Sequence, residues 1–111
     1  MANPRPLLKG TLDVLVLKAL TFGPRHGFEI AAWLDERSVG VFTVDDGALY
    51  YALHRMEERG LIDSEWGLTD TNRRARYYRL RPAGRAYLRT EGEHLARYAR
   101  ALSAVLAAGT A

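Results

Sequence analysis

Two groups of side chains in this sequence have types and spacing suited to chemistry. The first group is Tyr50, Tyr51, His54 and Arg55, and the second is Arg73, Arg74 and Arg76. Arginine carries a planar fork of donors that fits phosphate and base edges, and tyrosine and histidine both donate and accept hydrogen bonds. This combination predicts non-covalent binding of a polyanion, with nucleic acid as the leading candidate.

Bond-making chemistry finds little support in the sequence. There is no cysteine, and the three histidines (His26, His54 and His94) lack the spacing of metal ligands. No cluster of serine, histidine and acid and no glycine-rich phosphate loop is present. Asp45 and Asp46 stand where a helix N-terminus favours acidic caps. We therefore expect no enzyme activity, no metal and no cofactor.

Positive charge is concentrated in the last third of the chain. Residues 1–72 hold 7 Lys/Arg and 11 Asp/Glu, whereas residues 73–111 hold 9 and 2, within a net charge of +3. Such an asymmetry predicts an anionic partner at one face. A basic helix surface that only contacts water is the alternative, and charge alone does not separate the two.

The length of 111 residues suits one domain with its own core. No apolar run is long enough to span a membrane. Asp13 and Lys18 interrupt the apolar stretch near the N-terminus, which argues against a signal peptide. We expect a cytoplasmic protein without a membrane partner.

Three helices are expected first, over residues 10–20, 26–37 and from about 45 to 60. Asp45 or Asp46 is a suitable N-cap for the third helix, and Gly60 is a suitable C-terminal stop. Its apolar stripe leaves Tyr50, Tyr51, His54 and Arg55 on the opposite face.

A hairpin follows, with strands over residues 61–66 and 75–80 and a polar turn between them. Trp66 is expected in the core of this hairpin. The basic triplet Arg73, Arg74 and Arg76 then lies at or near the tip.

A long last helix is expected to begin at Pro82, a residue favoured at the first helical position. Its heptad seam, together with apolar positions of the first helix, predicts a homodimer interface, with an intramolecular packing face as the alternative. The predicted interface residues are Leu12, Leu15, Leu88, Leu95, Tyr98, Leu102 and Val105. Gly92, with a capping signal at Thr90 and Glu93, makes a kink or break in this helix plausible.

This order of elements predicts a mainly α (α+β) fold. It is a winged helix-turn-helix with a two-stranded wing and a long C-terminal dimerisation helix. The domain covers residues 1–81 and the dimerisation helix residues 82–111, as one compact unit. Topology alone does not establish DNA binding, since some winged helices bind only proteins.

From Leu7 to about Arg89 the chain resembles the phenolic-acid-decarboxylase-regulator (PadR) family of bacterial repressors. The resemblance rests on order and spacing across many short matches. These include the stretch from Leu8 to Asp13, Gly23-Pro24, His26-Gly27, Leu49-Tyr50, Arg59-Gly60-Leu61-Ile62, Glu65-Trp66-Gly67, Arg73-Arg74-Ala75, Tyr77-Tyr78 and Pro82-Ala83-Gly84. The single helix after the hairpin resembles the family's short branch.

The resemblance implies a homodimeric repressor that binds double-stranded DNA at a near-palindromic operator and is released by a signal, such as a small-molecule effector. It also implies DNA contacts from Tyr50, its neighbours and the wing arginines. The chain departs from the family pattern at Ala48, Tyr51 and Arg81, and these departures concern the operator sequence more than the fold. The alternatives are a protein-interaction module and, less well supported, a small enzyme or ligand-storage protein.

Overall fold

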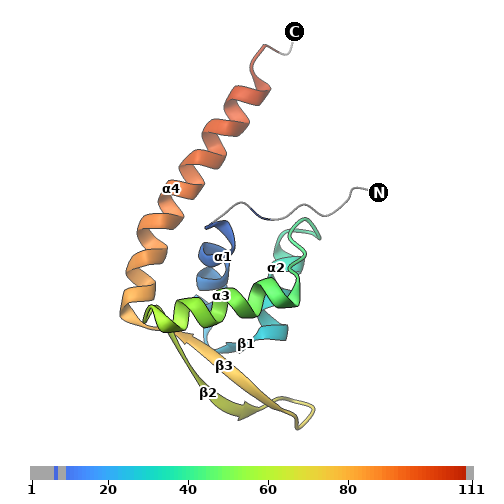
Figure 1. Cartoon of the computed structure of the whole chain (residues 1–111). Helices are drawn as coiled ribbons and strands as arrows, with labels where there is room; N and C mark the ends of the chain where they lie inside the picture. The colour runs from blue at the N-terminus through green and yellow to red at the C-terminus, as the bar shows by residue number, and fades with distance from the viewer. Residues whose placement is uncertain (1–6, 8–9, 110–111) are drawn as a thin grey trace.

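The computed structural model describes Leu7 and residues 10–109. Its elements, in chain order, are α1 (Thr11–Ala19), the 3₁₀ turn η1 (Leu20–Phe22), β1 (Arg25–His26), α2 (Gly27–Arg37), α3 (Asp46–Glu58), β2 (Ile62–Leu68), β3 (Arg74–Leu80) and α4 (Pro82–Ala107) (Figure 1). Leu8 and Lys9, near the start of the family resemblance, lie outside the described residues, as do residues 1–6, 110 and 111 of the predicted domain ranges.

The core forms where the first three helices meet the root of the hairpin. Val16, Leu17 and Ala19 of α1 are fully buried. They pack with apolar residues of α2 and α3, and with Ile62 and Tyr78 of the hairpin. Burial on more than one side of α1, predicted from its nearly continuous apolar sequence, is confirmed.

Local signals set the helix boundaries as predicted. The Asp45 carboxylate accepts a hydrogen bond from the amide of Ala48 and caps α3. Gly60 follows the helix with φ +76°, a conformation that disfavours side chains. His26 caps α2 in a reciprocal capping box with Glu29.

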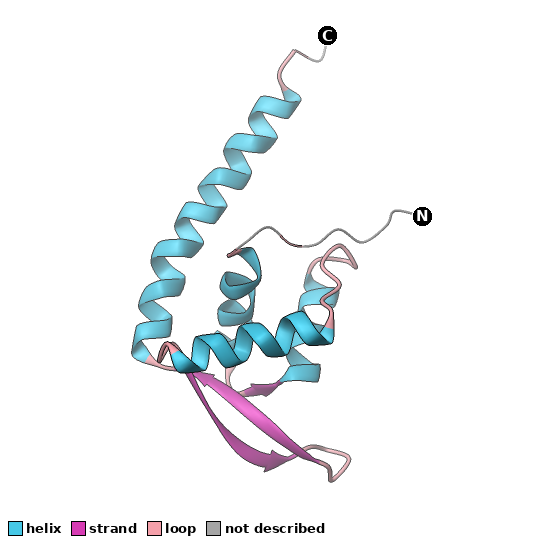
Figure 2. Cartoon of the chain, in the orientation of Figure 1, coloured by secondary structure: helices cyan, strands magenta, loops and turns pink. Residues whose placement is uncertain are grey.

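The sheet has three strands in the order β1-β3-β2, all antiparallel, where the sequence predicted two (Figure 2). The extra strand, β1, is only two residues long and pairs with Tyr77 and Tyr78. So short a strand leaves no periodic pattern to read. The hairpin strands also run further toward the tip than predicted, since Leu68 pairs with Arg74 and only residues 69–73 form the turn.

Helix α4 runs unbroken through Gly92, so no break forms there. Its start is fixed at the hairpin root, where the amide of Arg81 donates to the carbonyl of Leu61 at 3.0 Å. Its far half leaves the body of the molecule (Figure 1). The radius of gyration is accordingly 15.6 Å, against about 13 Å for a compact domain of this length. The observed elements form a winged helix-turn-helix fold, as predicted, while the domain boundary at 81/82 stays a prediction.

Candidate nucleic-acid interface

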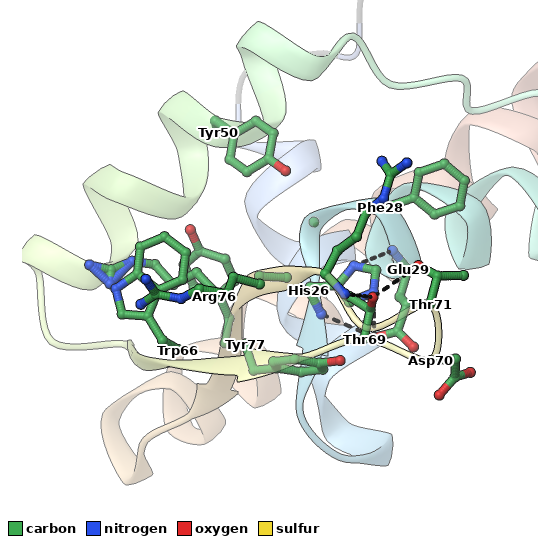
Figure 3. Close-up of a pocket in the computed structure, with 15 residues that line it drawn as sticks. His26, Phe28, Glu29, Tyr50, Trp66, Thr69, Asp70, Thr71, Arg76 and Tyr77 are labelled. Atoms are coloured by element: carbon green, nitrogen blue, oxygen red, sulfur yellow. Dashed lines mark hydrogen bonds and ion pairs between the residues drawn. The ribbon is translucent and has the colours of Figure 1, made fainter.

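An open groove of about 890 Å³ separates the hairpin from the N-terminal ends of α2 and α3 (Figure 3). Its walls come from three elements that are distant in sequence. His26 and Phe28 belong to the start of α2, Tyr50 belongs to α3, and Trp66 and Arg76 belong to the hairpin. Within the described residues, the groove brings Tyr50 of the first predicted group together with Arg73, Arg74 and Arg76 of the second, whereas Tyr51, His54 and Arg55 do not line it.

Tyr50 of α3 reaches the groove because the residue that its ring meets on α2, Gly27, has no side chain. A Cβ on Gly27 would lie 2.6 Å from the Tyr50 hydroxyl oxygen, so only glycine allows the phenol to lie against the first turn of α2. Tyr50 remains half exposed. Its hydroxyl is thereby held beside the N-terminal end of a helix, where backbone amides favour anions.

The hairpin has two faces of different character, because side chains alternate along each strand. On one face, Arg79 donates to Asp63 at 2.7 Å and lies 3.8 Å from Glu65, and Arg81 approaches Asp63 at 3.7 Å. The carboxylate of Asp63 raises the pKa of Arg79 above its ordinary value. This face carries its charges in pairs.

The other face runs from buried Tyr78 at the root to Trp66, Arg74 and Arg76 toward the tip. Trp66 is 57% exposed, so its predicted place in the hairpin core is wrong. Trp66 lies on the face of the hairpin whose root residues, Ile62 and Tyr78, belong to the core. The hairpin extends beyond the helices that would cover the Trp66 ring. The Cζ atoms of Arg74 and Arg76 lie 4.8 and 5.0 Å from the ring centroid instead.

No ion pair to Arg73, Arg74 or Arg76 is found within the described part of the chain, and all three are exposed. Three cations without a counter-ion therefore line one side of the groove. The arrangement suits an extended anion with repeated charges better than a single neutral ligand.

Comparison with known proteins assigns the family. The model of the transcriptional regulator PadR-like family matches residues 16–90, which include α2, α3 and the whole hairpin. The chain belongs to the PadR-like family. The resemblance found in the sequence is thus confirmed.

Two proteins similar to this PadR-like chain are named as transcriptional regulators. The transcriptional regulator Rv3488 of Mycobacterium tuberculosis is 44% identical over 70 residues, which cover 62% of this chain and 64% of that protein. A PadR family transcription regulator from Clostridium difficile has 27% identity and a TM-score of 0.71, covering 87% of this chain and 99% of that one.

Bacillus subtilis PadR in complex with operator DNA shares the fold at 20% identity, with a TM-score of 0.64. The match covers 71% of this chain and 45% of that one. At this identity the likeness concerns the fold alone.

The remaining predicted residues of α3 are divided between solvent and the core of the PadR-like fold. Tyr51 is 68% exposed, and His54 is exposed beside Glu58 at 3.6 Å. Arg55 instead donates from both terminal nitrogens to the Asp13 carboxylate, at 2.9 Å each. This hydrogen bonding raises the pKa of Arg55 above its ordinary value.

Asp13 is 4% exposed, so Arg55 supplies the counter-charge of a buried acid and holds α3 to α1. The sequence offered one signal for this pair, namely an acid within an otherwise apolar helix. It did not identify the partner 42 positions away. A DNA contact from Arg55 stays a prediction.

The predicted dimer residues fall into two sets. Leu12, Leu15 and Leu88 are partly buried against the chain's own core. Tyr98, Leu102 and Val105 on the far half of α4 are 58%, 46% and 71% exposed. Half-buried Leu95 lines a crevice of about 330 Å³ between α1 and α4.

Burial raises the pKa of Tyr78 above its usual value near 10, and the charge of Glu57 adds to this effect.

None of the helices in the described residues is both long and apolar enough to cross a membrane. Within the same residues, no group of three or more metal-ligating side chains comes together.

Proposed function

We propose that this PadR-like chain is a homodimeric transcriptional repressor that binds a pseudo-palindromic operator in double-stranded DNA. The observation that carries the proposal is the groove that α3 and the hairpin enclose, with Tyr50 on one wall and three unpaired arginines on the other. Helix α3 would enter the major groove, while the hairpin arginines bind phosphates or the adjacent minor groove.

The division of roles follows from the chemistry of each wall. Phosphate contacts from Arg73, Arg74 and Arg76 set affinity and register but read no sequence. Tyr50, Tyr51 and His54 face outward on α3 and set sequence preference. The operator complex of Bacillus subtilis PadR supports a DNA partner for this fold.

Exposed apolar residues on α4 support the homodimer. Tyr98, Leu102, Val105 and Leu106 form a strip on a helix that leaves its own domain, which is costly in water unless a second copy covers it. A two-fold dimer places two recognition helices about 34 Å apart, one turn of DNA. A small-molecule effector would release the operator by binding a dimer with a different spacing more tightly.

The experiment that tests this function is selection of sheared genomic DNA by the purified protein at near-physiological salt, followed by sequencing. Arg73→Glu/Arg74→Glu is the test variant. Arg85→Glu/Arg89→Glu is the matched control, because it makes the same charge change on exposed residues of α4.

A few enriched inverted repeats near promoters, lost in the test variant and kept in the control, are expected. No enrichment from a stable dimer would contradict the proposal and favour a protein-interaction module. Sedimentation equilibrium of Leu102→Asp tests the dimer separately, and a variant that sediments like the wild-type dimer would refute the proposed interface.

A further inference from the structure

One aromatic side chain in the groove has no role in the function proposed so far. Trp66 is exposed, stands on β2 directly opposite Arg76 of β3, and shares its face of the hairpin with Arg74. Figure 3 shows Trp66 and Arg76 together on one side of the groove. At 57% exposure the Trp66 ring is not held by core packing, and it contacts the two arginines instead.

The geometry points to Trp66 as the positioning residue of the wing: its ring holds Arg74 and Arg76 together as one preorganised two-cation site for a polyanion backbone. This inference rests on the proposed function, which makes DNA phosphate that polyanion. It adds a residue that carries no charge and determines how the charged residues are presented.

The first step of the argument is the repulsion between the two arginines. Side chains two positions apart on one strand share a face, so Arg74 and Arg76 lie close together. The described residues provide no carboxylate partner for either. The electron-rich face of an indole attracts both guanidinium groups, at 4.8 and 5.0 Å from its centroid.

The second step concerns conformational freedom. A free arginine side chain samples many rotamers and must be ordered when it binds a phosphate. Stacking on the indole orders both arginines before the anion arrives, while leaving them exposed. On the opposite face of the same hairpin Arg79 is also ordered, but by the carboxylate of Asp63, which compensates its charge. Stacking on the indole orders Arg74 and Arg76 without compensating theirs.

The test measures binding of a mixed-sequence DNA duplex of about 30 base pairs over a range of salt concentrations, since this binding is dominated by phosphate contacts. Trp66→Leu is expected to weaken binding by about 5- to 10-fold through loss of preorganisation. The salt slope stays unchanged, because the arginines still reach the phosphates. Arg74→Ala/Arg76→Ala lowers that slope by about 2.

The decisive variant combines both changes. If Trp66 acts through the arginines, Trp66→Leu has no further effect in the Arg74→Ala/Arg76→Ala background. A full additional loss there would overturn the inference and make Trp66 a direct DNA contact. Trp66→Phe keeps an aromatic face and is expected to restore part of the affinity. Leu68→Ala removes an exposed apolar side chain from the same face and serves as the matched control.

A second measurement needs no DNA. In a Trp33→Phe background Trp66 is the only tryptophan, and Arg74→Ala/Arg76→Ala is expected to increase its quenching by acrylamide. Equal quenching would refute the stack. If the wild type bound no duplex at all, the proposed function would fail. The same variants would then be compared on heparin, where equal affinity of wild type and Trp66→Leu would overturn the inference.

Discussion

The root and the tip of the hairpin are built from the same two strands and both carry arginines. They differ in whether those arginines have an acidic partner. At the root, Arg79 and Arg81 lie against Asp63. Toward the tip, Arg74 and Arg76 stack on Trp66 and have no acid partner within the described residues.

This difference separates the part of the molecule that secures folding from the part left for binding. Paired charges at the root cost the fold little. The charges at the tip have no acid partner within the described residues and repel one another, a local conflict of the kind found at functional sites that stacking on Trp66 offsets only in part. Substitutions at the root should therefore change stability, and substitutions at the tip should change binding.

The largest expected effect is at Gly84, where α4 meets the root. A Cβ there would overlap the backbone carbonyl of Leu61, which cannot move aside as a side chain would. Gly84→Ala is expected to lower the free energy of unfolding by about 3 kcal/mol in urea titrations. Gly92→Ala in the same helix is the control. Its Cβ would make ordinary contacts with Leu88 and Val14, so a gain of about 0.5–1 kcal/mol is expected.

Arg55→Ala should lower the free energy of unfolding by about 2 kcal/mol, because buried Asp13 loses its counter-charge. The value stays below that of a fully buried pair, since the Arg55 side chain is 37% exposed and solvent screens it. Restoration of stability in Asp13→Ala/Arg55→Ala would confirm the pairing. If Arg55→Ala left stability unchanged and weakened DNA binding, Arg55 would instead be a DNA-binding residue, as the sequence predicted.

Two single substitutions in the hairpin, one at the root and one toward the tip, should have smaller effects on different properties. Arg79→Gln should lower the urea midpoint slightly and leave DNA affinity unchanged. Arg76→Gln loses its stacking on Trp66 but also relieves the repulsion with Arg74, so the midpoint should change little, while DNA binding weakens and the salt slope falls by about 1. Equal loss of affinity in the two variants, measured on the same duplex, would erase the proposed difference between the two regions.

The smallest effect concerns pH. Burial favours the neutral form of Tyr78, so its folded-state pKa lies above the unfolded value near 10. The associated stability is complete below about pH 10 and is lost as the pH rises through the folded pKa. Urea midpoints between about pH 8 and pH 11 should fall less steeply for Tyr78→Phe. Identical slopes would mean that Tyr78 is not desolvated at the root.

Features encoded by neighbouring residues were predictable from the sequence. Asp45, Gly60 and Pro82 each mark a helix end through their own backbone or side-chain chemistry, and all three ends are where they were expected. Trp66 illustrates the limit. Its alternation with Ile62 gives the correct face, but how far the helices extend over that face is set by tertiary packing.

Contacts between distant segments were not predictable for the same reason. Strand β1 exists because it pairs with β3, and Asp13 finds Arg55 only after α1 and α3 have packed. The expected capping signal at Thr90 and Glu93 is local as well, but α4 continues through these residues and the break expected there is absent. The predicted DNA-binding and dimer residues stay predictions.

The attachment of α4 at Leu61 also has a mechanical consequence. The helix is 26 residues long, about 39 Å, so any change in its angle at the hairpin root is magnified at its far end. A rotation of about 5° at the root displaces the far end by roughly 3 Å, close to the rise of one DNA base pair. A small change in the angle of α4 at the hairpin root would thus appear at its far end as a displacement of about one base pair.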